Sequence, residues 1–506
     1  MMPFSRFIAF AVGHGHRLVM GALLLALPLA LGSCATNPAT GGQFFSLMSP
    51  QEEQQVGNEE HPKLVQSFGG EIANEEIKRY VTSVGNLLAK TTETPDAKFT
   101  FTVLDDNIVN AFALPGGYVH ITRGLLALVN DEAELAGVLG HEMGHITAHH
   151  SAQLYTRSVL TQILAAGVGI ATGSSEIGQV ATQGAGVYLK SYSRENEYEA
   201  DSLGVRYLTR AGYDPNAMAA FLKSLEAHSR LEAELAGQPP GTADQFDIMA
   251  THPRTVDRVQ RAIAEAGAGV HPARAADNGR EVYLRKINGL IYGDSPDQGY
   301  IRGDRFVHPK LRFEFRVPPE FRLANTPTAV MARNPNGAVI GFDEVQKAGA
   351  LTPRDYLSRL NVRLSEAEDI TINGLRAATA MARIQTSGGE RNLRVVAIRF
   401  SPEHLFRFIF LTPAQLTASL DEALKRTTYS FRSLSAAEAA ALKPYRIRVM
   451  RVHAGDTVRS LALLMPFPDY REERFRVLNG LGPNDGLPPN GLVKIVVEGD
   501  VPKSIL

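Results

Sequence analysis

Four of the chain's 14 histidines lie within one stretch of eleven residues, GHEMGHITAHH. The segment before it, VNDEAELAGVLG, opens with Asn and Asp and carries two glutamates soon after, a pattern that caps and begins a helix. Side chains four residues apart share one face of a helix. Two pairs could therefore chelate one metal ion, His141 with His145 or His145 with His149, and spacing alone does not choose between them.

Only the first of these pairs encloses a glutamate, Glu142, and so forms the pattern HExxH. A catalytic zinc site keeps an open position for water, and hydrolysis needs a carboxylate that takes the water's proton and delivers it to the leaving amine. We therefore predict that His141 and His145 bind the metal and that Glu142 is the general base; the alternative is a helix with surface histidines. His149 and His150 lack such support, and we expect them to be surface groups or neighbours of the ligands, dispensable for metal binding.

A third ligand is expected from a carboxylate on a second helix. The residues after HExxH lack the glycine and histidine of the metzincin pattern, so that class is excluded. The segment SRENEYEADSLGVRYL carries four acids at alternate positions, which a helix sorts into two faces. Glu197 and Asp201 lie on the face that continues into apolar residues. Glu195 and Glu199 lie on the face that continues into arginines, and we expect that face to be solvated.

Glu197 and Asp201 are therefore predicted to point inward, where two carboxylates are costly unless a cation or hydrogen-bond donors compensate. A metal would compensate Glu197. Asp201 can then accept the second ring N–H of a ligating histidine, most simply His141, and fix its tautomer. An acidic helix without a metal is the alternative, but joined to HExxH the pair predicts one Zn²⁺ per chain.

The N-terminal 33 residues are predicted to be a signal peptide. They contain Arg6 and Arg17, no acid precedes Glu52, and the run LVMGALLLALPLAL is shorter than the ~20 residues that span a bilayer. LGSC then places the only cysteine, Cys34, where it resembles a bacterial lipoprotein processing site; the alternative is a stray thiol. We expect cleavage before Cys34 and acylation of it. Ala35, not Asp, follows the cysteine, and the resemblance to enteric lipoproteins then implies the periplasmic face of the outer membrane, or the soluble periplasm if the chain is not lipidated.

Length and composition set the outer limits for the elements that must position these residues. A chain of 506 residues is too long for one ordinary core. Hydrophobic residues at 44% and charged residues at 21% are typical of a globular protein. Lys and Arg (52) balance Asp and Glu (53), which leaves no electrostatic footprint for nucleic acid, so we expect none as a partner. The fold class is predicted to be α+β multidomain.

The candidate residues fall in a predicted mainly helical domain at 49–275, preceded by a tether at 34–48. SPQEEQQVG has a helix N-cap and capping-box pattern. Within 99–122, FTFTVLDD and NAFALPGGYVHIT predict a small sheet with a Pro-Gly-Gly turn. The apolar stretch LTQILAAGVGIATG at 160–173 is too interrupted to span a bilayer and predicts a buried helix beside the site.

Three further segments complete the predicted organisation. Residues 276–304 are expected to be a linker, because the composition changes there and periodicity is weak. Residues 305–433 contain β-rich runs such as RFVHPKLRFEFRVPPEF and predict a separate α+β domain, to which we assign no chemistry. Residues 446–498 predict a small module in the order strand, helix, helix, strand.

HEMGH, the NEYEAD segment, the upstream NAFALPGG and the later THP together resemble the HtpX-type zinc metallopeptidases, gluzincins related to the CAAX prenyl endopeptidases, over roughly residues 45–275. Within this family the chain is most similar to the periplasmic and lipoprotein branch that includes BepA. The resemblance implies that His141, His145 and Glu197 bind zinc and that Glu142 is the general base.

By the same resemblance, Ala111, Phe112, Ala113 and Leu114 would form the edge strand that pairs with an extended protein substrate. His252 is implied as a fourth, displaceable zinc ligand that keeps the enzyme inactive at rest; the alternative is a loop histidine before proline. The chain departs from the BepA type because its C-terminal part shows no tetratricopeptide pattern, which puts the partners of that type in doubt here.

Two weaker likenesses concern the rest of the chain. HAGDTVRSLA, ERFRVLNGL and GLVKIV resemble a LysM module over 446–498, which implies contact with peptidoglycan; the alternative is a packing module without that role. FEFRVPPEF and the strands after it give 305–433 a likeness to PsbP or Mog1-like folds.

The sequence therefore predicts a zinc-dependent endopeptidase of the bacterial cell envelope that hydrolyses peptide bonds of misfolded or misassembled envelope proteins. The alternative is a lipid-anchored, peptidoglycan-associated binding or assembly factor with a resting or structural zinc site. Glu142 favours the enzyme, because a structural site needs ligands but no base.

Overall fold

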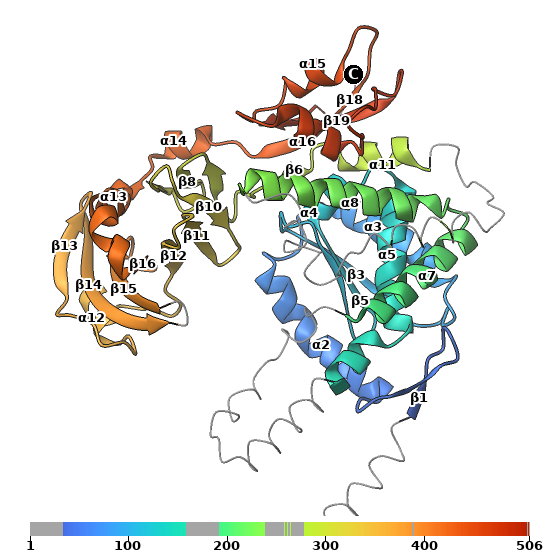
Figure 1. The fold of residues 1–506 in the computed structure, drawn as a ribbon, viewed down its shortest axis with the longest axis horizontal. Coiled ribbons are helices and arrows are strands. Elements are labelled where there is room, and N and C mark those ends of the chain that lie inside the picture. Colours follow the sequence, from blue (N-terminus) through green and yellow to red (C-terminus); the bar gives the residue numbers. More distant parts are fainter. Residues whose placement is uncertain are drawn as a thin grey trace, which may run out of the picture.

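The computed structural model describes residues 34–157, 192–237, 258, 261, 264, 278–386, 389–502 and 504. The predicted signal peptide, the apolar stretch at 160–173 and His252 lie outside these described residues. A mainly helical domain, a β-rich domain and a small C-terminal module make up the described part (Figure 1). This agrees with the predicted α+β multidomain architecture. Every helix in these ranges is too short or too polar to span a bilayer.

The segment 34–48, which we predicted to be a tether, contains a β-hairpin that packs on the helical domain. Strand β1 (Cys34–Thr36) pairs antiparallel with β2 (Gln43–Phe45). The turn closes through hydrogen bonds from the Asn37 amide to the Gly42 carbonyl and from the Gly41 amide to the Asn37 carbonyl. The tether was predicted from its turn-forming residues, Asn, Pro, Thr and Gly, and these residues form the turn of this hairpin.

The helical domain begins with two helices and a three-stranded sheet. Ser49 caps the first helix and shares a capping box with Glu52, as the sequence indicated. The sheet has the order β3-β5-β4, with β3 parallel to β5 and β4 antiparallel to it. The turn at Gly116 and Gly117 has positive φ angles of 80° and 92°, which only glycine adopts readily. These elements are α2 (Pro50–Ser67), α3 (Glu75–Ala89), β3 (Thr100–Leu104), β4 (Ala111–Leu114) and β5 (Tyr118–Thr122).

Helix α5 lies at the centre of the rest of this domain. It packs against α3, α7, α8 and strand β4 and is buried on nearly all sides, so it is fixed within the core. Helices of this part include α4 (Arg123–Leu128), α5 (Glu132–Thr147), α7 (Arg194–Arg210) and α8 (Asn216–Leu235).

The β-rich domain contains a seven-stranded antiparallel sheet with the order β10-β11-β12-β16-β15-β14-β13 and a smaller sheet with the order β17-β9-β8-β7. A core of phenylalanines joins the two sheets, with Phe313, Phe342 and Phe431 buried at its centre. The strands are β7 (Tyr300–Arg302), β8 (Arg305–His308), β9 (Phe313–Arg316), β10 (Arg322–Asn325), β11 (Ala329–Arg333), β12 (Val339–Glu344), β13 (Glu368–Ile372), β14 (Leu375–Thr386), β15 (Gly389–Arg399), β16 (Leu405–Pro413) and β17 (Arg432–Ser433), and the helices are α12 (Pro353–Ser358) and α13 (Thr417–Ser430).

The C-terminal module has the predicted order of strand, helix, helix, strand. Its two strands pair antiparallel, and a third strand from the segment before the β-rich domain adds to the sheet. Its elements are β18 (Tyr445–Arg451), α15 (Val458–Ala462), α16 (Arg471–Leu478) and β19 (Leu492–Glu498), and the third strand is β6 (Ile291–Tyr292). The short helix α14 (Ala436–Ala441) lies in the segment that leads from the β-rich domain to the module. Figure 1 shows the module lying over α8 and α11.

The segment 276–304, predicted to be a linker, is structured and joins all three parts. Its helix α11 (Arg280–Ile287) buries Tyr283, Leu284 and Ile287 in a core shared by the helical domain and the C-terminal module. The sequence did not reveal this helix, because its eight residues make only about two turns, which is too short for a clear repeat of buried and exposed positions.

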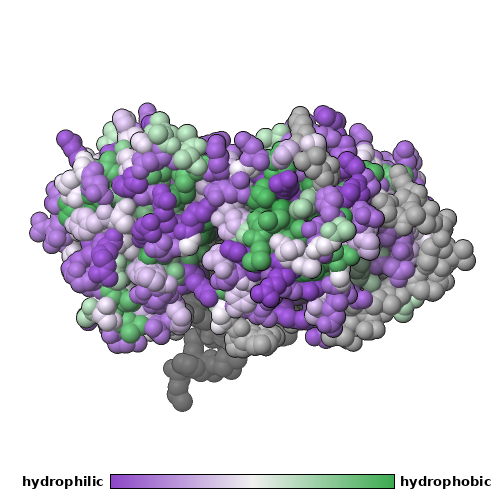
Figure 2. All heavy atoms as spheres, turned by 90° about the horizontal axis from the view of Figure 1, so that it is seen from above, coloured by the Kyte–Doolittle hydropathy of each residue, from purple (hydrophilic) through white to green (hydrophobic). Residues whose placement is uncertain are grey.

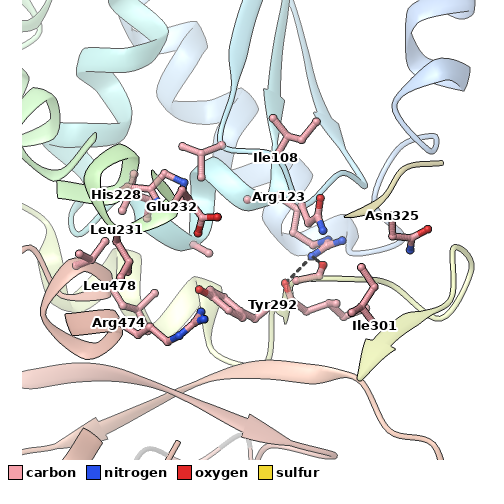
Figure 3. A pocket seen from close by; sticks show the side chains of 18 of the residues that line it. Ile108, Arg123, His228, Leu231, Glu232, Tyr292, Ile301, Asn325, Arg474 and Leu478 are labelled. Carbon is pink, nitrogen blue, oxygen red and sulfur yellow. Dashed lines mark hydrogen bonds between the residues drawn. The ribbon is translucent and has the colours of Figure 1, made fainter. Parts of the chain in front are cut away.

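Lys494 of β19 connects the C-terminal module to the helical domain through buried hydrogen bonds. Its side chain is fully buried, and Nζ donates to the carbonyls of Ala127 and Val129 at 2.7 Å each. These carbonyls belong to the end of α4, where helices leave acceptors without helical partners. A cavity of about 420 Å³ lies where the three parts meet, and Arg123 and Arg474 approach it from opposite sides (Figure 3).

Candidate metal centre

Helix α5 presents His141, Glu142 and His145 from inside the core. Asp131 caps the helix by accepting from the Glu134 amide at 2.7 Å, and the predicted choice of Asn130 or Asp131 is thereby settled. His141, Glu142 and His145 are all buried, with 7% or less of each residue exposed. A rigid buried helix therefore sets the spacing of these three side chains.

Helix α7 crosses α5 closely enough to bring a carboxylate to the histidines. A methyl group at Gly144 would lie 3.0 Å from the Ala200 carbonyl oxygen, and one at Gly204 would lie 3.0 Å from the His141 amide nitrogen. Both distances are shorter than ordinary van der Waals contact, so glycine allows this approach. It places Glu197, which is fully buried, opposite the two histidines.

The three predicted ligands converge. His145 Nε2 lies 3.1 Å from His141 Nε2 and 3.5 Å from Glu197 Oε1, and His141 Nε2 lies 3.8 Å from Glu197 Oε2. Two donors that each sit ~2.1 Å from a tetrahedral ion are about 3.4 Å apart, and the observed distances bracket that value. Within the described ranges this is the group of histidines and acids with the geometry of a metal site. Its two nitrogens and one carboxylate oxygen fit zinc.

Asp201 lies one helical turn beyond Glu197 and reaches the other ring nitrogen of a ligand. Its Oδ1 is 2.9 Å from His141 Nδ1, so the carboxylate can hold the proton there and leave Nε2 free to bind a metal. Glu197 and Asp201 both point inward, as the helix faces indicated.

Arg258 was not among the predicted site residues, yet it contacts both inward carboxylates. Its Nη1 lies 2.7 Å from Glu197 Oε2, and its Nε and Nη2 donate to the two oxygens of Asp201. Burial alone raises the pKa of Asp201, but the charge and hydrogen bonds of Arg258 outweigh burial and hold that pKa below its ordinary value. Asp201 therefore stays ionised and remains an acceptor.

His149 and His150, the other two histidines, have different surroundings. His149 adopts a left-handed backbone with φ 55°, stacks on Phe44 and pairs with Glu53, whose Oε1 lies 3.0 Å from its Nδ1. His150 is only 1% exposed, and its Nδ1 lies 2.8 Å from Nδ1 of the ligand His145. It is therefore a neighbour of the ligands and not a surface group.

Glu199 corrects the expectation that its helix face is solvated. Its Oε2 lies 3.2 Å from His150 Nε2, and its Oε1 accepts from Asn37 Nδ2 at 2.7 Å. The hydrogen bond with His150 is the largest cause of a lowered pKa at Glu199. The N-terminal hairpin covers this face at Glu199, whose side chain is 28% exposed, whereas Arg206 and Arg210 further along the face are 39% and 46% exposed. The pattern of one helix could not reveal this local contact. Glu195 on the same face is exposed, as expected.

Tyr192 is a further contact of the ligands that the sequence analysis missed. Its ring stacks on His145 with centroids 4.0 Å apart, and its hydroxyl lies 3.0 Å from Ser151 Oγ. No local sequence signal marks it, because it lies in the connection before α7 and reaches the site only in the folded chain.

The predicted edge strand is β4, with the bounds Ala111–Leu114. It pairs with β5 on one side, and no second strand partner is found for it in the part of the chain that the structure describes. Its side chains are buried against α2 and α5. A partner could therefore contact β4 only through the backbone N–H and C=O groups of the strand. His252, predicted as a fourth ligand, lies outside the described residues.

Known proteins resemble the part of the chain that holds this centre. A family profile described as Peptidase family M48 matches residues 75–266. The beta-barrel assembly-enhancing protease of Escherichia coli (strain K12) is 29% identical over 281 residues, 54% of this chain and 55% of that protein. Metalloprotease LoiP of the same strain is 27% identical over 191 residues, 37% of this chain and 70% of that protein. The chain thus spans about half the length of the assembly-enhancing protease.

Among solved structures, cyanobacterial PsbP (CyanoP) from Synechocystis sp. PCC 6803 is 15% identical, with a TM-score of 0.22, and the match covers 28% of this chain and 98% of that one. A score this low does not establish a shared fold. The likeness of residues 305–433 to PsbP or Mog1-like folds stays a prediction.

Proposed function

We propose, from the premise that residues 75–266 are a domain of peptidase family M48, that this chain is a zinc-dependent endopeptidase of the bacterial cell envelope. The match falls within residues 45–275, where the sequence resembles zinc metallopeptidases, and that prediction is confirmed. The substrates we propose are misfolded or misassembled envelope proteins. The similarity to the beta-barrel assembly-enhancing protease of Escherichia coli supports this substrate class.

The donor cluster on α5 and α7 is the observation that carries the proposal. Two histidines and a glutamate around one open position are the ligand set of catalytic zinc in peptidases. Glu142 is buried beside the ligands on the same helix. A binding or assembly factor with a structural zinc site would have no use for this carboxylate, so we favour the enzyme.

Each side chain of the centre then has a chemical task. Zinc, when bound, supplies Lewis acidity to the scissile carbonyl and to the attacking water. Glu142 would accept the proton of that water and donate it to the leaving amine. Asp201 keeps His141 in the tautomer that leaves Nε2 free, and Arg258 keeps Asp201 ionised.

Strand β4 is the proposed site for an extended substrate backbone. An edge strand offers unpaired N–H and C=O groups to which a peptide can add as a further strand. Strand β4 packs against α5, the helix that carries Glu142 and the histidines. A peptide bound along β4 would therefore pass close to Glu142 without any sequence-specific contact, which suits an enzyme that removes many misfolded proteins.

We also propose that acylated Cys34 holds the enzyme at the periplasmic face of the outer membrane, and that residues 446–498 contact peptidoglycan. The C-terminal module offers apolar side chains for a sugar ring, since Leu463 and Leu464 are 58% and 57% exposed. Figure 2 shows apolar residues gathered over this module in an otherwise mostly hydrophilic face. Sedimentation with purified sacculi tests this: a Leu463→Ser and Leu464→Ser double variant should stay in the supernatant.

The test of the enzyme compares wild type with Glu142→Gln at equal zinc content. Wild type should cleave casein or an unfolded outer-membrane protein, and the variant should lose at least about 100-fold in kcat, the contribution of a general base. Equal cleavage by the two proteins would refute the mechanism.

A further inference from the structure

We propose that the N-terminal hairpin is part of the metal centre, because its Asn37 fixes the ligand His145 in the metal-binding tautomer through Glu199 and His150. The proposal deepens the proposed function and rests on it. It makes Asn37, Glu199 and His150 positioning residues, which act on His145 through one another.

The first link joins the ligand to its buried neighbour. His145 faces the donor cluster with Nε2, so this nitrogen must carry the lone pair and Nδ1 must carry the proton. His145 Nδ1 lies 2.8 Å from His150 Nδ1. The hydrogen bond therefore runs from His145 to His150, and His150 must accept at Nδ1 and carry its own proton on Nε2.

The second link fixes the direction of this chain. His150 Nε2 lies 3.2 Å from Glu199 Oε2, and an ionised carboxylate can only accept. Glu199 therefore selects the tautomer of His150 with the proton on Nε2. In the opposite tautomer, His150 would donate from Nδ1 to His145 Nδ1. His145 would then need its lone pair on Nδ1 and its proton on Nε2, and a protonated Nε2 cannot bind a metal.

The third link reaches the hairpin. Asn37 is 5% exposed, and its Oδ1 accepts from the Ala39 amide at 2.9 Å. Because Oδ1 is used within the turn, Nδ2 of the same amide points toward α7, where it donates to Glu199 Oε1 at 2.7 Å. The turn itself needs only the hydrogen bond of Oδ1, so the contact of Nδ2 with Glu199 serves the link to α7.

Other contacts seat the hairpin so that Asn37 meets Glu199. The carbonyl of Ala39 accepts from Arg206 Nη1 on α7 at 3.1 Å. Below the hairpin, the Leu47 amide donates to Thr156 Oγ1 at 2.9 Å. Undocking this segment would remove the side-chain hydrogen bonds of Asn37 and Thr40 from Glu199 and loosen the orientation of His145, so the state of the N-terminal segment is coupled to the metal centre.

The test measures zinc affinity of the full chain by competition with a chelator, and the electronic spectrum of the Co²⁺-substituted protein as a probe of ligand geometry. Contrary to the sequence-based expectation that His150 is dispensable, His150→Leu should weaken zinc binding about 10- to 100-fold, the usual effect of removing a partner of a metal-bound histidine. His150→Asn should restore most of it, because the amide oxygen can replace Nδ1 as acceptor. Asn37→Ala should weaken binding and alter the Co²⁺ spectrum.

Thr36→Ala is the matched control, since Thr36 lies in the same hairpin and is exposed; it should leave zinc affinity unchanged. Wild-type affinity in both His150→Leu and Asn37→Ala would overturn this proposal alone, provided that wild type binds zinc and cleaves. A wild type that binds no zinc would overturn the proposed function as well.

Discussion

Arg258 binds both carboxylate oxygens of Asp201, with Nε 2.8 Å from Oδ2 and Nη2 2.7 Å from Oδ1. Its remaining nitrogen, Nη1, lies 2.7 Å from Glu197 Oε2, while Glu197 Oε1 faces His145. One guanidinium thus contacts both oxygens of Asp201 and one oxygen of Glu197, whose other oxygen belongs to the donor cluster. A bidentate arginine suits this task better than lysine, because its fork matches the carboxylate.

Replacing Arg258 with Leu should destabilise the protein by about 3–5 kcal/mol, the usual cost of leaving a buried partner charge uncompensated. The loss should be larger with a chelator than with excess zinc, because zinc also neutralises Glu197. Thermal melts under both conditions measure this difference. Arg261→Leu is the control, since Arg261 is exposed and lies over the Tyr198 ring. Equal loss with and without zinc would contradict the shared role.

Glu197→Ala should abolish stoichiometric zinc binding, because it removes the only carboxylate donor of the cluster among the described residues. Glu195→Ala should retain one zinc per chain, since Glu195 lies on the same helix but is exposed. Metal analysis after dialysis gives the stoichiometry. Glu199 would be a poor control, because it acts on His145 through His150. Retention of zinc by the Glu197 variant would remove it from the ligand set.

Local patterns explain what the sequence could predict of the fold. The cap at Ser49, the alternation before Leu104 and the turn at Gly116 are each determined by a few neighbouring residues. Neighbouring residues do not determine how the hairpin and α11 dock, since their docking depends on contacts between distant segments. Lys494, for example, meets carbonyls 365 to 367 residues earlier in the chain.

The candidate site shows the same division. The period of a helix separated Glu197 and Asp201 from Glu199, and the cost of two buried carboxylates called for a cation. The sequence could not identify which cationic side chain compensates these carboxylates, because several arginines follow the site and only the fold brings Arg258 to it. Glu199 was misplaced on a solvated face because a helix pattern takes no account of what another segment, here the hairpin of Asn37, lays on it.

Lys494→Met should release the C-terminal module from the helical domain without unfolding either. The carbonyls of Ala127 and Val129 would lose the donor Lys494 Nζ, and each buried acceptor without a partner costs about 1–3 kcal/mol. Hydrogen exchange of β19 should then accelerate by ~100-fold, which corresponds to about 3 kcal/mol of local stability. Lys443→Met, at an exposed lysine, should exchange like wild type. Unchanged hydrogen-exchange protection of β19 in the Lys494 variant would show that these hydrogen bonds do not hold the module on the helical domain.

His308 should make the β-rich domain sensitive to acid. Burial, aided by the charge of His404, lowers the pKa of His308 to about 4, below the ~6.5 of a free histidine. Its Nδ1 accepts from the Leu311 amide at 3.2 Å, which only the neutral ring can do. The unfolded chain therefore binds more protons, so stability is full above pH ~6.5 and falls as the pH drops toward ~4.

The loss at this histidine amounts to at most about 3 kcal/mol, from a pKa difference of roughly 2.5. Thermal melts between pH 7.5 and 4.5 should show a shallower decline for His308→Asn, whose amide oxygen keeps the acceptor but does not titrate. His453→Asn, at a side chain that is 65% exposed, should follow wild type. Parallel curves for all three proteins would rule His308 out as the titrating group.

Backbone recognition by β4 predicts a specific sensitivity to N-methylation. Because Ala111 to Leu114 are buried, the strand can recognise a substrate only through its own N–H and C=O groups. Methylating a peptide nitrogen that bonds to β4 should raise KM about 10-fold or more per lost bond, while methylating the adjacent nitrogen, which points away from an edge strand, should change little. A series of one peptide methylated at successive positions, with kcat and KM measured for each, should therefore alternate with a period of two. A series without alternation would show that β4 does not pair with the substrate, and the side chains that hold the peptide would have to be sought elsewhere around Glu142.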